Sequence, residues 1–172
     1  HKEYRRQRQM CIRDSCNTEW LEGNDIDIMD GVLTDNNLHA LKADGQTAWP
    51  NVFAVGDIAK FPNALFEGET RRVEHWNIPT ESGKHVGQLI AQGDAFETAG
   101  FKPVPSFWSD QFDVHLLAFG LLALADSHKL VQGEIDGDCV FEYYRGDKLV
   151  GAAGIGMRSV VQGYRNVFAA SN

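Results

Sequence analysis

Residues 51–58 read Asn-Val-Phe-Ala-Val-Gly-Asp-Ile. The apolar, β-prone run from Val52 to Val55 leads directly into Gly56, and an acid, Asp57, follows at once. Such a run is typical of a parallel strand that is covered on both faces. Glycine lets the backbone approach a ligand closely, and open α/β sheets bind ligands beyond the carboxyl ends of their strands. The stretch therefore predicts a buried parallel strand that ends at a ligand-binding turn, although an ordinary strand ending in a Gly-Asp turn would look the same.

The composition limits the classes of protein that this chain can represent. Its 172 residues are 43% hydrophobic, which suffices for one sizeable domain or two small ones. A formal net charge of −8 disfavours nucleic acid as a partner. The longest apolar run, Leu116–Ala125, is shorter than the roughly 20 residues of a membrane span, so no span is expected. The three cysteines form neither a disulfide framework nor a C-x-x-C pair, which favours a reducing, cytoplasmic location.

The first residues differ in character from the rest of the chain. His1–Ser15 carry five basic and two acidic residues and show no apolar periodicity. The string from Arg6 to Ser15 resembles a translated sequencing adapter, and the alternative is a basic, disordered arm. We interpret residues 1–16 as a non-native or disordered segment and exclude them from the expected fold.

The middle of the chain is expected to hold one helix between less regular segments. Gly31–Asp35 predicts a brief strand, and Phe61–Arg72, rich in turn formers, predicts a surface loop. A helix should begin with Asn77 as its N-cap and end at Gly93, because apolar and small residues between them follow helical spacing. The polar segment Gly93–Pro105 then predicts a linker.

After the linker the pattern changes to short strands. The hairpin turn Arg145–Lys148 separates the last two of four predicted strands, which are Val114–Phe119, Lys129–Gly133, Cys139–Arg145 and Leu149–Ile155. Ser159–Ala170 predicts an amphipathic helix. The fold class expected is therefore an α/β portion followed by a small α+β C-terminal domain with an antiparallel sheet.

Two further groups of residues could carry chemistry. Glu74, His75 and Trp76 come directly before the helix expected from Asn77, whose free N-terminal N–H groups can stabilise an anion. Trp108 lies in the Phe107–Gln111 string, just after the expected linker. Each group also has a plainer explanation, an aromatic residue that caps the core and a buried Trp that anchors a domain.

Other features are expected to carry no function. The glycines between Gly151 and Gly156 are misspaced for a G-x-G-x-x-G loop and indicate a tightly packed strand end. No pair of His or Cys residues has the spacing of metal ligands, so no metal site is expected. The simplest interpretation makes solvated surface groups of Glu67, Glu69, His85, His115 and His128.

Three strings occur in a particular order, Val-Phe-Ala-Val-Gly-Asp, Arg-Val-Glu-His-Trp and Phe-Trp-Ser-Asp-Gln. With them, the chain from Asn17 onward resembles the ferredoxin/rubredoxin reductase-like flavoproteins, which include apoptosis-inducing-factor-like oxidoreductases. The resemblance implies that Asp57, next to Gly56, accepts a hydrogen bond from the ribityl chain of FAD. It also implies that the helix points at the isoalloxazine edge. Flavin and nicotinamide contacts are implied for Glu74, His75 and Trp76. Trp108 is implied to open the C-terminal domain and to reach back to the flavin, where its large flat ring would shield the isoalloxazine from water.

The resemblance also implies a domain organisation and a reaction. Residues 17–100 would be the C-terminal portion of a FAD-binding domain, and residues 101–172 a reductase C-terminal domain. The parent enzyme would use NAD(P)H and FAD to pass electrons to an iron–sulfur protein of the ferredoxin or rubredoxin type. The Gly-rich FAD loop and the NAD(P)-binding domain of that family are not in this sequence, so these residues alone are expected to be inactive. The alternative is a non-catalytic interaction or dimerisation module, and a homodimer stays open.

Overall fold

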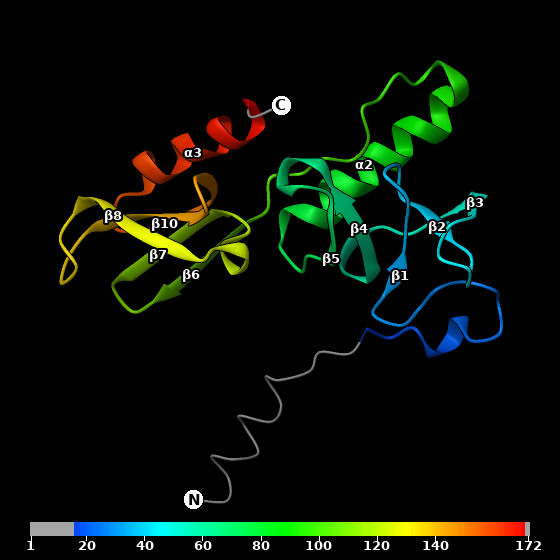
Figure 1. Cartoon of the computed structure of the whole chain (residues 1–172), viewed down its shortest axis with the longest axis horizontal. Coiled ribbons are helices and arrows are strands. Elements are labelled where there is room, and N and C mark those ends of the chain that lie inside the picture. Colours follow the sequence, from blue (N-terminus) through cyan, green and yellow to red (C-terminus); the bar gives the residue numbers. More distant parts are fainter. Residues whose placement is uncertain (1–15, 171–172) are drawn as a thin grey trace, which may run out of the picture.

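The structure, a computed structural model, describes residues 16–170, which form two lobes side by side (Figure 1). The N-terminal lobe (residues 16–100) contains five short strands and helix α2, and the C-terminal sheet domain (residues 101–170) contains five longer strands and helix α3. The expectation for residues 1–16 lies outside the described residues except at Cys16. No helix in residues 16–170 is long and apolar enough to cross a membrane.

The N-terminal lobe has two small sheets. In the first, β1 (Val32–Leu33) runs parallel to β4 (Ala59–Asn63), which pairs antiparallel with β5 (Glu69–Arg72). In the second, β2 (His39–Leu41) pairs antiparallel with β3 (Ala48–Phe53). The brief strand predicted around residues 31–35 is therefore confirmed.

The prediction of a buried parallel strand at Val52–Val55 was wrong. β3 ends at Phe53 and pairs antiparallel, and the side chains of Val52 and Val55 are 39% and 41% exposed. The parallel strand is β4, which begins only after the Gly56 turn. The apolar run was misleading because only Ala54 of these residues is buried, and nothing in residues 16–170 covers the two valines.

The prediction of a surface loop at residues 61–72 was also wrong. Phe61 and Phe66 are 1% exposed and lie in the core, in β4 and just after it. Asn63 is buried as well: its amide Nδ2 donates to the Pro103 carbonyl at 2.8 Å, and its Oδ1 accepts from the Leu65 N–H at 3.1 Å. The turn formers are present, but the apolar residues between them pack inward and override the local signal.

Replacing this buried amide should measurably weaken the fold. We expect Asn63→Ala to lower the free energy of unfolding by about 1–3 kcal/mol, because the Pro103 carbonyl would lose its buried donor. Urea denaturation of the chain measures this. Asn166→Ala, on the exposed side of the last helix, is the control and should change the value by less than about 0.5 kcal/mol. Equal effects of the two substitutions would contradict the role of Asn63.

Helix α2 (Asn77–Gln92) agrees with the sequence except at its start. Trp76 takes the N-cap position and makes no side-chain capping bond, so the prediction that Asn77 caps the helix was wrong. The Asn77 amide instead donates to the Val104 carbonyl at 3.1 Å, because the linker lies within its reach. Gly93 ends the helix as predicted, with φ +53° and its N–H bonded to the Leu89 carbonyl.

The C-terminal sheet domain is antiparallel throughout, as predicted. Its strand order is β6-β7-β10-β9-β8. The strands are β6 (Ser106–Gln111), β7 (Val114–Gly120), β8 (Ser127–Gly133), β9 (Cys139–Arg145) and β10 (Lys148–Ile155). The edge strand β6 was not predicted, because the Phe-Trp-Ser-Asp-Gln string lacks a simple alternation.

Helix α3 (Arg158–Ala170) covers one face of this sheet (Figure 1). A Cβ at Gly154 would stand 2.5 Å from Cγ2 of Val161, so the small residue lets the helix approach β10 closely. The Tyr164 hydroxyl donates to Glu142 of β9 at 2.6 Å. The expected close packing at the Gly151–Gly156 glycines is thus confirmed.

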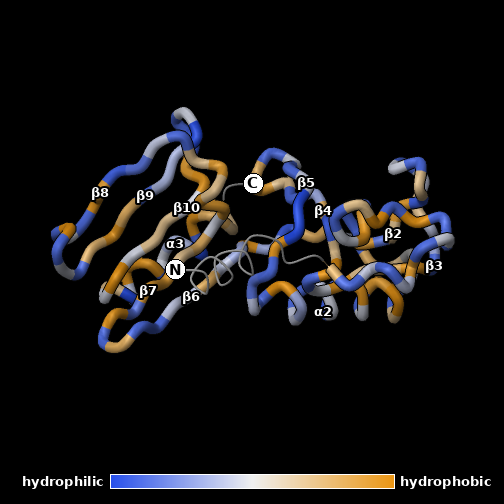
Figure 2. The backbone as a smooth tube through the Cα atoms, turned by 90° about the horizontal axis from the view of Figure 1, so that it is seen from below, coloured by the Kyte–Doolittle hydropathy of each residue, from blue (hydrophilic) through white to orange (hydrophobic). Residues whose placement is uncertain are grey.

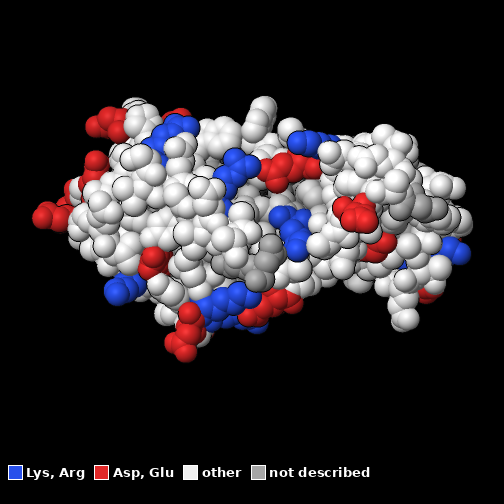
Figure 3. Space-filling model, turned by 90° about the horizontal axis from the view of Figure 1, so that it is seen from above, with Lys and Arg blue, Asp and Glu red and all other residues white. Residues whose placement is uncertain are grey.

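The two lobes contact one another through an apolar and an ionic interface. The rings of Phe66 and Phe168 lie 5.9 Å apart, and Phe168 belongs to α3. Nearby, Arg145 lies 3.1 Å from Glu69, within a partly exposed group of ion pairs. Exposed pairs contribute only about 0–1 kcal/mol each, so the buried rings supply most of the attachment. Figure 2 shows apolar segments running through both lobes, and Figure 3 shows charges of both signs interspersed on one face.

Candidate functional site

The Gly56-Asp57 turn is fastened to the first turns of α2. Gly56 starts the short 3-10 helix Gly56–Ile58 and has φ +75°, a backbone conformation that favours glycine. Its buried N–H donates to the Ser82 hydroxyl at 3.0 Å, and that hydroxyl donates to the Ile78 carbonyl at 2.6 Å. The Asp57 side chain, in contrast, is exposed. The backbone of the turn is therefore fixed while its carboxylate is free to meet a ligand.

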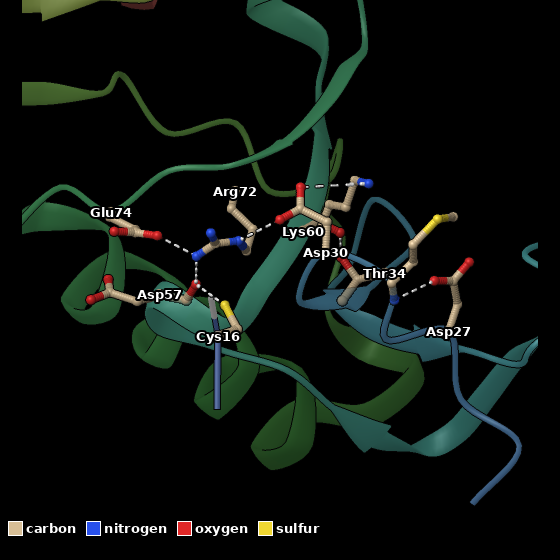
Figure 4. Close-up of polar contacts among 9 residues, drawn as sticks. Cys16, Asp27, Asp30, Thr34, Asp57, Lys60, Arg72 and Glu74 are labelled. Atoms are coloured by element: carbon tan, nitrogen blue, oxygen red, sulfur yellow. Dashed lines mark hydrogen bonds and ion pairs between the residues drawn. The ribbon is translucent and has the colours of Figure 1, made fainter. Parts of the chain in front are cut away.

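Arg72 connects this turn to the segment before α2 (Figure 4). Its Nη1 donates to the Asp57 carbonyl at 3.3 Å and also to the Glu74 carboxylate. Its Nε donates to Asp30 at 3.1 Å. Burial acts to lower the pKa of Arg72, but the hydrogen bonds to Asp30 and Glu74 outweigh it, so the pKa is raised and the guanidinium stays charged.

His75 lies between the two lobes. Its carbonyl accepts the Ile78 N–H at 2.9 Å as α2 begins, and its ring centroid lies 5.4 Å from that of Phe107 in β6. The Nδ1 atom is buried and has no partner among the described residues. Burial lowers the pKa of His75, so the ring is neutral at neutral pH and leaves one nitrogen available to a ligand.

Two tryptophans form an exposed aromatic pair across the lobes. Trp76 is 79% exposed and Trp108 is 53% exposed, and their ring centroids lie 6.4 Å apart at 73°. Trp76 is therefore not an aromatic residue that caps the core, and Trp108 is not a buried anchor of its domain. Large exposed aromatic rings without cover are typical of surfaces that meet a ligand or partner.

A pocket of about 590 Å³ lies beside these residues, between β5 and the segment that follows β7. Of the six predicted site residues, only Glu74 and His75 line it, whereas Gly56, Asp57 and the two tryptophans do not. Its lining residues include Arg71 and His75, whose buried Nε and Nδ1 atoms have no hydrogen-bond partner within residues 16–170. The lining residues are Asp30, Arg71, Arg72, Val73, Glu74, His75, Phe107, Gly120, Leu121, Leu122 and Ala123. The lining combines charged residues from one lobe with mostly apolar residues from the other, which suits a ligand that has a polar edge and an apolar face.

Sequence reasoning included Arg71 and Arg72 in the string before α2 but gave neither a role, and it did not identify Ser82 as a site residue. The position of the two arginines at the start of this string was the available signal. Ser82 gave none beyond its small size at a core-facing helical position. His85 was also misjudged as a surface group: its ring packs against Phe96 and Phe101 at 5.4 and 5.5 Å, and burial lowers its pKa.

The burial of His75 predicts a pH dependence of stability. Its pKa lies below the ordinary 6.5 in the folded protein, so the unfolded chain binds the proton first as the pH falls through about 6.5. The free energy of unfolding should therefore fall with pH in this range and level off below the lowered pKa. Urea denaturation between about pH 8 and about pH 5 measures the slope. His75→Gln should reduce the slope and leave the part that comes from the partly buried His85, whereas His128→Gln, at an exposed site, should not reduce it. A slope unchanged by His75→Gln would contradict this account.

Comparisons with known proteins show which family and which relatives this chain resembles. Residues 106–172 match the family described as Reductase C-terminal. Over 88 residues the chain is 34% identical to the 5,5'-dehydrodivanillate O-demethylase ferredoxin reductase subunit of Sphingobium sp. (strain NBRC 103272 / SYK-6), which covers 51% of this chain and 20% of that protein. Over 132 residues it is 33% identical to the p-cumate 2,3-dioxygenase system ferredoxin–NAD(+) reductase component of Pseudomonas putida. This match covers 76% of this chain and 28% of that protein. The chain thus spans less than a third of either relative.

Solved structures agree. The ferredoxin reductase for the CYP199A2 system from Rhodopseudomonas palustris has a TM-score of 0.69 at 27% identity, covering 86% of this chain and 34% of that chain. The structure of the covalent putidaredoxin reductase–putidaredoxin complex has a TM-score of 0.73 at 21% identity. The match covers 88% of this chain and 34% of that chain and shows a shared fold. The family match over residues 106–172 identifies a reductase C-terminal domain in this part of the chain. Together with the relatives and the shared fold, it supports a C-terminal part of a FAD-dependent pyridine-nucleotide oxidoreductase.

Proposed function

We propose that this chain supplies one side of the flavin site in an NAD(P)H-dependent FAD oxidoreductase that passes electrons to a ferredoxin- or rubredoxin-type acceptor. In this proposal residues 17–100 are the C-terminal portion of the FAD-binding domain and residues 101–172 are the reductase C-terminal domain. The observation that carries it is the gathering of Gly56, Asp57 and residues 74–76 around the start of α2, with Trp108 beside Trp76.

The described residues suit a flavin in three respects. The fixed turn leaves the Asp57 carboxylate free to accept a hydrogen bond from a ribityl hydroxyl. The first N–H groups of α2 and its dipole favour negative charge at the pyrimidine edge of the ring. His75, with its unpaired Nδ1, would contact the ring, and Trp76 and Trp108 would exclude water from it.

When bound, FAD supplies the redox chemistry, accepting a hydride and releasing electrons one at a time. The protein residues position and protect it. Arg72 donates hydrogen bonds to the Asp57 carbonyl and to the Glu74 carboxylate. These contacts would hold the turn and the segment that contains His75 in place beside the flavin. The names of the matched relatives support an iron–sulfur acceptor, since two of them are ferredoxin reductase components.

Activity can be tested in a chimera. In it, residues 17–172 replace the matching C-terminal segment of the Pseudomonas putida reductase component, which supplies the remaining length. We expect the purified chimera to bind FAD and to reduce a ferredoxin or a rubredoxin with NADH or NADPH. The measurement is the bleaching of the acceptor's visible absorbance. A chimera that binds FAD and reduces neither acceptor with either nucleotide would contradict the proposed function.

The alternative, a non-catalytic interaction or dimerisation module, predicts a different result. Residues 101–172 would then fold without the N-terminal lobe, and the chimera would hold no flavin. The buried contact of Phe66 with Phe168 favours the two lobes acting together.

A further inference from the structure

We propose that Arg72 is a positioning residue that locks the two halves of the candidate site, the Asp57 turn and the Glu74–Trp76 segment, into one arrangement. The proposal rests on the proposed function only in that these halves face a flavin. The coupling itself is a property of the chain and can be tested without the cofactor.

The contacts of Arg72 join segments that are distant in the sequence. Its Nη1 reaches the Asp57 backbone carbonyl, 15 residues earlier, and the Glu74 carboxylate, two residues later. Its Nε reaches Asp30, 42 residues earlier, at 3.1 Å. Figure 4 shows the guanidinium between these three partners. One side chain therefore connects the loop before β1, the Gly56 turn and the approach to α2.

Gly31 leaves space for the side chain of Arg72. A Cβ at Gly31 would stand 2.5 Å from Cδ of Arg72 and 2.5 Å from the Ile58 carbonyl oxygen. Gly31 also has φ +78°, which other residues rarely adopt. The missing side chain at Gly31 thus leaves room for the arginine stem beside the Ile58 carbonyl, next to the Asp57 carbonyl that the guanidinium meets.

Only a guanidinium suits this role. The side chain is 13% exposed, and it satisfies a carbonyl and two carboxylates at once through a planar fork of donors. A lysine ammonium at the end of a flexible stem can pair with one carboxylate but lacks the fixed geometry for the others. We therefore expect Arg72→Lys to lose part of the coupling between the Asp57 turn and the Glu74–Trp76 segment, and Arg72→Gln to lose all of it.

The first test uses the 172-residue chain without flavin. We expect Arg72→Gln to shift the backbone amide NMR signals of both Asp57–Ile58 and Glu74–His75 and to raise hydrogen exchange in both segments. Lys60→Gln is the matched control, because its ammonium lies 3.8 Å from the same Asp30. It should leave both segments unchanged. A response to Arg72→Gln confined to one segment, or equal to that of Lys60→Gln, would overturn the coupling.

The second test asks whether the coupling matters for the flavin. In the chimera, we expect Arg72→Gln to speed FAD release about tenfold and Arg72→Lys about threefold, as expected for lost hydrogen bonds to charged groups. Lys60→Gln should stay within about twofold. Arg72→Lys keeps the charge and the stem, so it decides the outcome if Arg72→Gln fails to fold. Release equal to the control in both variants overturns the positioning role, whereas a chimera with native Arg72 that binds no FAD refutes only the proposed function.

Discussion

Asp57→Ala should weaken FAD binding by the chimera about tenfold to a hundredfold. A hydrogen bond to a charged group contributes about 1.5–3 kcal/mol, which corresponds to that range of affinity. The Asp57 carboxylate is exposed, and the contact that holds the turn is its backbone carbonyl, which the substitution leaves in place. The effect should therefore appear in flavin affinity and not in folding. Fluorescence titration of the apo-chimera with FAD measures it.

The control for this prediction is another exposed acid. Asp147→Ala, in the turn between β9 and β10, removes the same charge far along the chain from the Gly56 turn. It should change the FAD dissociation constant by less than about twofold. If Asp57→Ala behaves like Asp147→Ala, the carboxylate does not contact the cofactor and the proposed site loses its anchor.

Phe66→Ala should cause the largest loss of stability. Phe66 is 1% exposed in the N-terminal lobe and packs against Phe168 of α3, so its removal leaves a cavity at the contact between the lobes. Truncation of a buried phenylalanine costs about 3–5 kcal/mol. Urea denaturation of the chain, followed by circular dichroism and tryptophan fluorescence, should show this loss. The two signals should also separate, because the lobes would no longer unfold together.

The matched control is Phe112→Ala. Phe112 is fully exposed between β6 and β7, so the same truncation removes no packing there. The free energy of unfolding should change by less than about 0.5 kcal/mol. A loss below about 1 kcal/mol for Phe66→Ala would mean that this ring does not hold the lobes together.

The sequence predicted the C-terminal sheet domain better than the N-terminal lobe. Strands β8, β9 and β10 follow one another in the chain through short connections and pair with their neighbours in sequence, so local patterns and the turn at Arg145–Lys148 were sufficient. Helix α3 followed from its apolar stripe. Strand β6 has no such pattern and is defined by its pairing with β7.

The N-terminal lobe depends on long-range packing that a local pattern does not contain. Phe61–Arg72 contains turn residues, yet Phe61 and Phe66 are buried by partners from elsewhere in the chain, such as Phe101 and Phe168. Val52 and Val55 look like core residues but have no covering layer among residues 16–170. In both segments the burial of a side chain depends on which distant residues pack over it, and the composition of the segment does not determine this.

The candidate site shows the same division. Motif order predicted Gly56, Asp57, Trp108 and residues 74–76 as site residues, and in the structure they lie near the start of α2. The roles of Ser82 and Arg72 were not predicted because they depend on contacts across 26 and 15 residues. Local sequence does not reveal which backbone group a buried hydroxyl or guanidinium will meet.

The most direct test of the central claim is a crystal structure of the FAD-bound chimera. We predict that the isoalloxazine ring lies at the N-terminus of α2, with His75 and Trp76 in van der Waals contact and the Asp57 carboxylate within hydrogen-bond distance of a ribityl hydroxyl. A flavin bound with none of these residues in contact would contradict the account.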